Sequence, residues 1–247
     1  MGRYLKWGAW TALTAFCIGA AWIGSYFVYP DVSSLKKLNP QKTAFMAYRE
    51  EEAARKGKNI KQFQRWVPLS RISPFLADAV LIAEDDKFWQ HEGFDIEGMQ
   101  EALEKDIKAG KLKAGGSTIT QQLAKNLFLS PEKSPVRKIK EAVLTWRLER
   151  SLSKRRILEL YLNVAEWGDG VFGAEAAAQR HFGKSASQLS PEEAARLAAV
   201  LPNPRRFNAA GNSRYVANRV RAIYAILAKR DRGVSAYEEL MKSNGEE

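Results

Sequence analysis

The sequence predicts a mainly α-helical domain that follows one transmembrane helix at the N-terminus. Apolar residues recur at spacings of three and four along much of the chain, and Ser or Thr followed by Gln or Glu marks several helix starts. Runs of strictly alternating apolar and polar residues are nearly absent, so little of the chain suits a sheet. A stretch of 21 residues near the N-terminus contains no Asp, Glu, Lys or Arg.

Residues 1–30 are predicted to form a short cytoplasmic N-terminus and a membrane anchor. The uncharged stretch, Gly8–Val28, would span roughly 31 Å as a helix, close to the hydrocarbon thickness of a bilayer. Aromatic residues lie at both of its ends. Arg3 and Lys6 precede it without an acid, which favours an N-terminus in the cytoplasm. The alternative is a cleaved signal peptide, but the apolar stretch is longer than the apolar region of a typical signal peptide.

Residues 31–68 are predicted to be a polar, irregular connector with a helical pattern around residues 45–58, and residues 69–247 to be the catalytic domain. Ser73 with Pro74 marks the start of one helix in this domain, and Thr118 with Gln121 marks another. Further helices are expected to begin at Asp95, Ser190 and Ser235, and a late amphipathic helix is expected around Val216, Val220, Ile223 and Leu227.

The composition indicates a globular protein that binds anions. The chain has 247 residues, of which 45% are hydrophobic, and this argues against a disordered protein. Its formal net charge of +11 favours nucleic acid, anionic lipid headgroups or phosphorylated substrates as partners. The single cysteine excludes an internal disulfide and, with only two histidines, leaves too few ligands for a zinc site.

Glu84 is the first candidate for catalysis. It ends the helix that begins at Ser73 and lies one residue beyond the apolar face at Ala83. The negative end of the helix dipole and partial burial would both raise its pKa, as suits a general acid or base. Taken alone, Glu84, Asp85 and Asp86 are better explained as a solvated acidic helix end than as a catalytic group.

Two further segments carry side chains suited to an anionic ligand. In residues 115–126 a glycine pair leads into a helix start with several hydroxyl groups, which can bind an anion. A capped surface helix is the alternative, but it does not explain the paired glutamines. In residues 133–141 one acid, Glu141, lies among four cations, which would hold it ionised and could bind a diphosphate, whereas a solvated basic face is the alternative. The basic-to-apolar segment 154–163 is expected to be structural.

The order of these segments resembles that of the peptidoglycan glycosyltransferases, which polymerise the glycan of the bacterial cell wall. The resemblance covers roughly residues 70–210 and rests on EDDKFWQHEGFD, GGSTITQQLAKN, RKIKE, KRRILELYLN and LPNPRRFN. It implies a lysozyme-like helical fold. It also implies inverting transfer from a lipid diphosphate, in which lipid II, a disaccharide-pentapeptide on undecaprenyl diphosphate, is joined to a growing glycan strand.

The resemblance also implies residue roles. Glu84 would be the general base, and Glu141 would assist at the diphosphate. No cofactor is required by the sequence, although the family admits a divalent cation, Mg or Mn, at the diphosphate. Substrate binding is expected from Asp85, His91, Ser117, Thr118, Gln121, Gln122, Lys125, Asn126, Lys133, Arg137, Lys138 and Lys140.

The expected location is the bacterial inner membrane, which the chain would cross once, with the catalytic domain in the periplasm. The expected partners are lipid II, the nascent glycan strand, membrane lipids and proteins of cell-wall synthesis or division, with no nucleic acid. Residues 94–114 are expected to lie against the membrane, with Lys105, Lys108, Lys111 and Lys113 near anionic headgroups.

Three other functions are alternatives to glycan polymerisation. A membrane-bound lytic muramidase acts on the same polymer, but a hydrolase would use a pair of carboxylates, whereas a cluster of cations suits a diphosphate leaving group. Residues 151–154 match the SxxK motif of a penicillin-binding transpeptidase, but no KTG follows. A non-enzymatic basic membrane anchor explains the net charge but not the ordered motifs.

Overall fold

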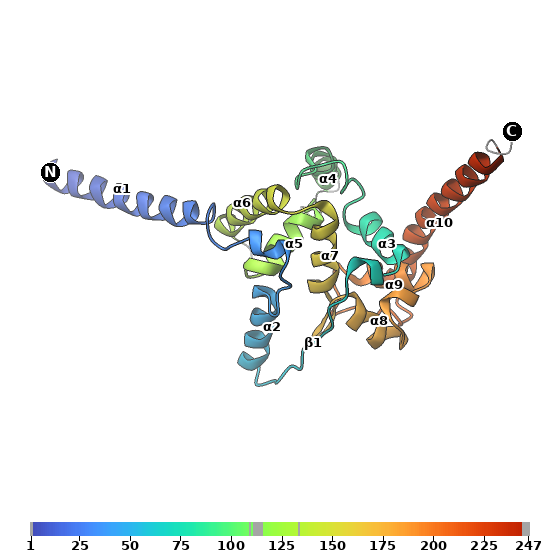
Figure 1. The fold of residues 1–247 in the computed structure, drawn as a ribbon. Helices are drawn as coiled ribbons and strands as arrows, with labels where there is room; N and C mark the ends of the chain where they lie inside the picture. The colour runs from blue at the N-terminus through green and yellow to red at the C-terminus, as the bar shows by residue number, and fades with distance from the viewer. Residues whose placement is uncertain (1, 109, 111–115, 133, 244–247) are drawn as a thin grey trace.

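The computed structural model describes residues 2–108, 110, 116–132 and 134–243, and these are mainly helical, as the sequence predicts. A central body of packed helices carries two projecting helices on opposite sides, α1 at the N-terminus and α10 at the C-terminus (Figure 1). The α-helices are α1 Gly2–Ser25, α2 Ala44–Arg55, α3 Pro74–Glu84, α4 Ile96–Lys108, α5 Ile119–Phe128, α6 Pro135–Ser151, α7 Lys154–Val164, α8 Ala174–Phe182, α9 Pro191–Val200 and α10 Arg214–Ser243. Short 3-10 helices cover Ser33–Lys36, Leu69–Arg71 and Ala186–Gln188.

The core lies between two groups of helices. Helix α9 packs against α3 and α10, while α5 packs against α2, α6 and α7. The apolar spacings read from the sequence supply this core, because Leu76 and Val80 of α3 and Leu123 of α5 are fully buried. Helices α3 and α5 thereby bring the ends that carry the candidate side chains to one place.

Most of the predicted helix starts are confirmed. Pro74 opens α3, a capping box of Thr118 and Gln121 opens α5, and a capping box of Ser190 and Glu193 opens α9. The start expected at Ser235 is wrong, since α10 continues from Arg214 to Ser243 without a break. A serine with a glutamate three residues later is therefore also accommodated inside a long helix.

A small sheet is present that the sequence did not predict. Its strands are β1 Phe63–Gln64, β2 Glu166–Gly168 and β3 Val171–Phe172, in the order β1-β3-β2. Strand β1 pairs with β3 in parallel, and β2 pairs with β3 in antiparallel orientation. Strands of two or three residues are too short for an alternating pattern to be recognised.

Residues 31–68, expected to be an irregular connector, are folded onto the catalytic body. Val32, Leu35 and Val67 are buried in its core. Helix α7 holds this segment by polar contacts, because Arg156 Nε donates to the Leu35 carbonyl at 2.8 Å and Asn163 Nδ2 donates to the Val67 carbonyl at 2.9 Å. The structural role expected for segment 154–163 is thus confirmed.

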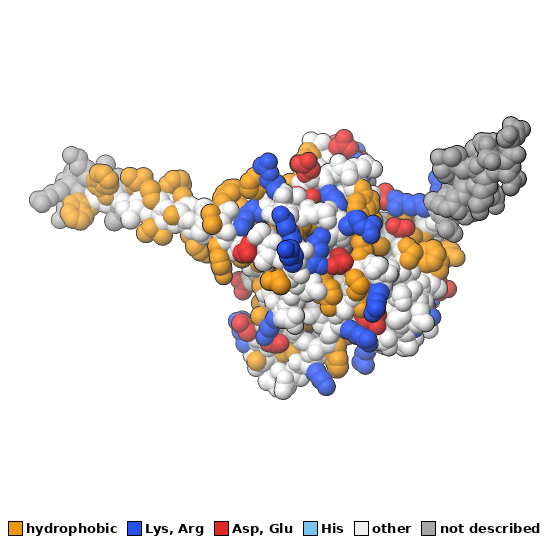
Figure 2. All heavy atoms as spheres, viewed as in Figure 1, with side chains coloured by type: hydrophobic (Ala, Val, Ile, Leu, Met, Phe, Trp, Pro, Cys, Tyr) orange, Lys and Arg blue, Asp and Glu red, His pale blue; other side chains and the backbone are white. Residues whose placement is uncertain are grey.

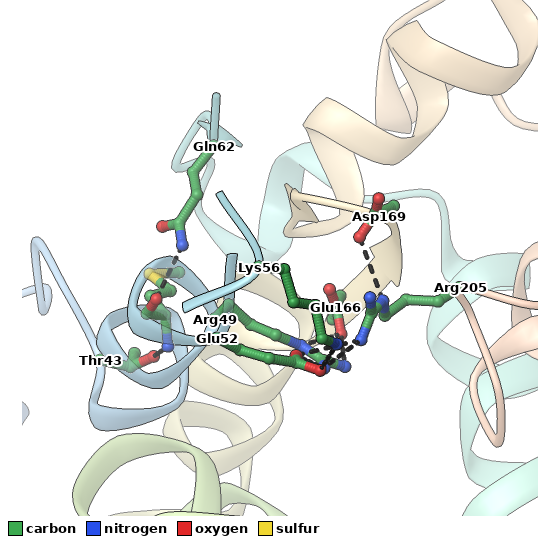
Figure 3. Close-up of polar contacts among 9 residues, drawn as sticks. Thr43, Arg49, Glu52, Lys56, Gln62, Glu166, Asp169 and Arg205 are labelled. Atoms are coloured by element: carbon green, nitrogen blue, oxygen red, sulfur yellow. Dashed lines mark hydrogen bonds and ion pairs between the residues drawn. The ribbon is translucent and has the colours of Figure 1, made fainter. Parts of the chain in front are cut away.

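An ion-pair network fixes α2 to the sheet (Figure 3). Arg49 donates through Nε and Nη2 to Glu166 Oε2 of β2, at 3.0 and 2.6 Å. Glu52 accepts from Arg49 at 2.9 Å and from Arg205 at 3.1 Å, and Arg205 also pairs with Asp169 at 3.1 Å. Because Arg205 lies between α9 and α10, this network joins three segments that are far apart in the sequence.

The N-terminal helix presents apolar side chains to its surroundings (Figure 2). Trp7, Phe16 and Trp22 of α1 are exposed. Within the described residues, no helix reaches the combination of length and apolarity needed to cross a membrane. The transmembrane helix over residues 8–28 therefore stays a prediction.

Candidate active site

Glu84 is the last residue of α3, and its side chain is only 12% exposed. Gln122 of α5 donates through Nε2 to Glu84 Oε2 at 2.9 Å, and Arg219 of α10 lies 4.0 Å from Oε1. Burial raises the pKa of Glu84 above its ordinary value, while Gln122, Arg219 and Lys125 act in the opposite direction. The sequence-based expectation of a partly buried carboxyl with a raised pKa is confirmed.

Asp85 and His91 join the end of α3 to the start of α5. Asp85 Oδ2 accepts from the backbone N–H of Ile119 at 2.9 Å, and its Oδ1 lies 2.8 Å from His91 Nε2. The backbone N–H of Gly93 donates to His91 Nδ1 at 3.1 Å, so Nε2 carries the ring proton and donates to Asp85. The structure therefore gives both residues, expected to bind substrate, contacts within the protein that position Glu84 beside α5.

Gly93 permits this close packing. It has a φ of +89°, and a Cβ there would lie 2.8 Å from Thr145 Cγ2 of α6. Its carbonyl accepts from Thr118 Oγ1 at 2.7 Å, which ties the loop after α3 to the cap of α5. A larger residue would separate α3, α5 and α6.

The residues predicted from α5 fall into two groups. Thr118 and Gln121 form the capping box and are buried, so their contacts lie within the protein, while Asn126 is buried but lines a pocket beside the site. Gln122 and Lys125 are only partly buried, and Ser117 is exposed. The second group faces Glu84 and the cations of α6, where a ligand can reach it.

Glu141 of α6 is buried, at 3% exposure, between two cations. Arg137 donates to its Oε2 and Lys138 to its Oε1, and Lys138 Nζ also lies 3.4 Å from Ser117 Oγ. The charge of Lys125 interacts with both Glu84 and Glu141. Burial lowers the pKa of Lys125, and the two carboxylates act in the opposite direction. The structure thus brings Glu84, Lys125 and the Glu141 group to one site.

Lys140 does not join this group, contrary to expectation. Its Nζ lies 3.2 Å from the ring centroid of Trp22 and 4.7 Å from that of Tyr26, at the end of α1. One residue corresponds to about 100° of rotation around a helix, so Lys140 leaves α6 on a different side from Glu141. Lys133, also expected at the site, lies outside the described residues.

Two residues at the site were missed by sequence reasoning, Arg219 and Tyr161. Arg219 belongs to α10, far along the chain, and no local pattern distinguishes it from other cations of that helix. Tyr161 of α7 is buried, and its hydroxyl donates to Gln122 Oε1 at 3.0 Å. The sequence signal that could have found Tyr161 is the need of a buried tyrosine hydroxyl for a partner.

A pocket of about 220 Å³ adjoins the site. It is lined by Gln122, Lys125 and Tyr161, and on its other side by the loop after α9 with Asn203 and Arg205. Among the described residues, no three His, Cys, Asp or Glu side chains come together to hold a metal ion. Both oxygens of Glu141 accept from cations, Oε2 from Arg137 and Oε1 from Lys138.

A mainly helical domain in which the Glu84 carboxyl lies near the cations of α5 and α6 suits a transferase that acts on an anionic, activated donor. The chain matches the family model described as Transglycosylase over residues 50–228, and it belongs to this family. The match begins inside the segment expected to be a connector, in agreement with the packing of α2 onto the domain.

Similar curated proteins carry one name, Biosynthetic peptidoglycan transglycosylase. The chain is 47% identical to that of Nitrosospira multiformis over 86% of this chain and 93% of the relative. It is 55% identical to that of Aromatoleum aromaticum over 76% of this chain and 83% of the relative. It is 46% identical to that of an Azoarcus species over 95% and 97%. The predicted family is confirmed.

Proposed function

We propose that the protein is a peptidoglycan glycosyltransferase that polymerises lipid II into glycan strands for the bacterial cell wall and releases undecaprenyl diphosphate. The observation that carries the proposal is the position of Lys125, whose charge interacts both with Glu84, a largely buried carboxyl with a raised pKa, and with the group of Arg137, Lys138 and Glu141. Membership of the transglycosylase family and the names of the relatives support the same activity.

Glu84 is the proposed general base. The acceptor hydroxyl is a poor nucleophile, so a positioned carboxylate has to take its proton as the new glycosidic bond forms. A raised pKa makes Glu84 a stronger base than an ordinary carboxylate. The hydrogen bond from Gln122 and the nearby charge of Arg219 favour its ionised form.

The cations of α5 and α6 are the proposed site for the leaving group. As the bond from the sugar to the diphosphate breaks, negative charge develops on the phosphate oxygens, and fixed cations stabilise that charge. Glu141 holds Arg137 and Lys138 side by side against their mutual repulsion. A divalent cation, Mg or Mn, would add positive charge at the diphosphate when bound, and no step proposed here requires it.

A lytic muramidase is the second candidate, since it acts on the same polymer. Cleavage of an unactivated glycosidic bond requires a proton donor for the leaving oxygen. The nearest second carboxylate in the sequence, Asp85, is bound by Ile119 and His91. The cations beside Lys125 favour a diphosphate leaving group and therefore synthesis.

We also propose that the chain crosses the bacterial inner membrane once through residues 8–28, with the catalytic domain in the periplasm. The exposed aromatic side chains of α1 and the flanking Arg3 and Lys6 support this topology. Helix α4 supports contact with membrane lipids, because its apolar side chains Ile96, Leu103 and Ile107 are exposed. The proposed partners also include proteins of cell-wall synthesis or division, but not nucleic acid.

The test is polymerisation of lipid II by the purified full chain and by Glu84→Gln. The amide keeps the size of the side chain but cannot accept a proton, so turnover should fall roughly 10²–10⁴-fold. Asp86→Asn is the matched control, since Asp86 is an exposed carboxylate two residues away and should keep wild-type turnover. Turnover by Glu84→Gln close to the wild-type rate would show that another group is the base.

A further inference from the structure

A chain of two hydrogen bonds leads from the interior of the protein to Glu84. The Tyr161 hydroxyl on α7 donates to Gln122 Oε1 at 3.0 Å, and Gln122 Nε2 donates to Glu84 Oε2 at 2.9 Å. Tyr161 is 1% exposed, whereas Gln122 is partly exposed and reaches the candidate base. The tyrosine therefore touches Glu84 only through the amide.

The two ends of this chain agree on its direction. Burial and the charges of Glu84 and Asp85 raise the pKa of Tyr161 well above its ordinary value, so the phenol keeps its proton and can donate. Within the Gln122 amide only Oε1 can accept that proton, whereas an ionised Glu84 can only accept and therefore takes an N–H of Nε2.

An amide without such a partner has two orientations that differ by a half-turn. In one of them Gln122 directs N–H toward Glu84, and in the other it directs its own oxygen at the carboxylate. The second polar contact of Nε2, with the Ser117 carbonyl at 3.5 Å, is long. Among the described contacts, the Tyr161 hydroxyl therefore selects, from the Oε1 side of the amide, the same orientation that an ionised Glu84 favours from the Nε2 side.

We propose that Tyr161 is a positioning residue, which locks the Gln122 amide so that its N–H directs Glu84 toward the acceptor hydroxyl and holds it ionised. This inference rests on the proposed role of Glu84 as general base. It assigns to α7 a part in the reaction besides the packing role seen at Arg156 and Asn163.

The groups around Glu84 determine how its pKa changes when the Gln122 amide is no longer held by Tyr161. The groups that act on its charge are Gln122 and Lys125 from α5, Arg219 from α10 and Asp85 at the end of α3, whereas Tyr161 from α7 reaches it through Gln122. Of these, Gln122 is the one that makes a close hydrogen bond to the carboxylate. When the amide is no longer held, the hydrogen bond that favours the ionised form weakens, and the pKa of Glu84 should rise further.

The experiment measures lipid II turnover between pH 5 and 9 for the full chain, Tyr161→Phe, Gln122→Ala and the double variant. Phenylalanine keeps the buried ring and removes only the hydroxyl. We expect kcat to fall about tenfold with little change in KM, and the acidic limb of the kcat profile to move to higher pH. The double variant should lose no more activity than Gln122→Ala alone, because the tyrosine acts through the amide.

The control is Tyr224→Phe, which removes a hydroxyl from an exposed tyrosine of α10 and should leave turnover and pH profile unchanged. A Tyr161→Phe enzyme with a wild-type pH profile overturns the proposal, even if its melting temperature and turnover fall, because that pattern indicates packing alone. Losses that add in the double variant overturn it as well. An inactive Glu84→Gln with an unaffected Tyr161→Phe refutes only this inference, whereas an active Glu84→Gln removes the base assignment and this inference together.

Discussion

At the scale of single residues, Glu84 combines two properties that oppose each other. Its carboxyl is buried enough for the pKa to be raised, yet it has to ionise to act as a base. A group with a raised pKa in the folded protein stabilises the fold below its unfolded pKa, and this contribution is lost as the pH rises through the folded pKa. The candidate base thus costs stability at the pH where it works.

Glu84→Gln should therefore be inactive and also at least as thermostable as the wild type. Glutamine cannot ionise, so the variant avoids the cost of burying a charge above the raised pKa of Glu84. We expect its melting temperature to exceed that of the wild type at pH 8 and the difference to shrink toward pH 4. Melting curves across this range check the expectation, and a lower melting temperature of the variant at pH 8 would contradict it.

Lys138 and Lys140 provide a second comparison, because they are two residues apart and contact different partners. Lys138 Nζ contacts Glu141 and Ser117, so Lys138→Met should lower lipid II turnover by about tenfold or more. Lys140 lies against Trp22 and Tyr26, so Lys140→Met should keep turnover within about twofold.

The expected cost of Lys140→Met is a loss of stability, since a desolvated cation–π contact contributes about 2 kcal/mol. The measurements that test both expectations are the lipid II turnover and the melting temperature of Lys138→Met and Lys140→Met. Strong loss of turnover in a stably folded Lys140→Met enzyme would restore this lysine to the diphosphate site, where the sequence alone had put it.

At the scale of elements, the pair of Arg49 with Glu166 is the most buried ion pair of the network that holds α2. Glu166 is 3% exposed in its side chain, and burial raises its pKa although Arg49 donates to it twice. Removing Arg49 would leave a buried carboxylate without its partner, and such losses cost about 3–5 kcal/mol. Arg49→Met should lower the stability of the whole domain by an amount on that order.

Arg55→Met is the matched control for α2. Arg55 pairs with Glu51 on the same helix, and both side chains are largely exposed, so the pair contributes little. Urea unfolding of the two variants measures the difference. Equal unfolding midpoints would show that α2 is not fixed by the Arg49–Glu166 pair.

The elements also show what a sequence can and cannot predict here. Caps such as Thr118 with Gln121 are local patterns, and they predicted the starts of α5 and α9 correctly. Glu84, Lys125 and Glu141 were found because ordered motifs carry them. Arg219 was missed because it reaches the site through the packing of α10, which no local pattern reveals. Tyr161 lies in segment 154–163, which the sequence predicts to be structural, and its contact with Gln122 arises from the packing of α7 against α5.

Two other differences between the sequence-based prediction and the structure also arise from how the helices pack. The sequence predicts a polar connector over residues 31–68. A few apolar side chains of this segment, among them Leu35 and Val67, are nevertheless buried in the core, and they hold the segment against the domain beside α7. Lys140 was assigned from its sequence neighbours to the diphosphate site, yet the angle of one residue on α6 directs it to the end of α1. Composition identifies a cluster, and helix geometry decides which members face the ligand.

At the scale of the whole molecule, the proposed membrane topology makes a simple prediction. A reporter fused to the C-terminal end of the chain should be active only outside the cytoplasmic membrane, because Arg3 and Lys6 would keep the N-terminus inside. Paired reporters that work on one or the other side of the membrane measure this. Activity of the cytoplasmic reporter would reverse the topology and place the domain on the wrong side of the membrane for the proposed reaction.

The same topology predicts that α4 lies at the membrane surface. Three of its apolar side chains, Ile96, Leu103 and Ile107, are 52% to 68% exposed, although they share one face of the helix. A helix of a water-soluble domain normally buries such a face. Lipid headgroups and acyl chains would cover it at the interface, with the charged face of the helix toward water.

A fluorophore attached to Leu103→Cys, in a chain where Cys17 is replaced by Ser, should report this contact. In nanodiscs its emission should shift to the blue and be quenched by lipids that carry a quencher. The matched control is Glu104→Cys, one residue further along α4, where Glu104 is 71% exposed in its side chain and faces a different direction. Its fluorophore should remain in water, because adjacent positions on a helix lie about 100° apart. Equal emission and quenching at the two positions would show that α4 does not lie on the bilayer.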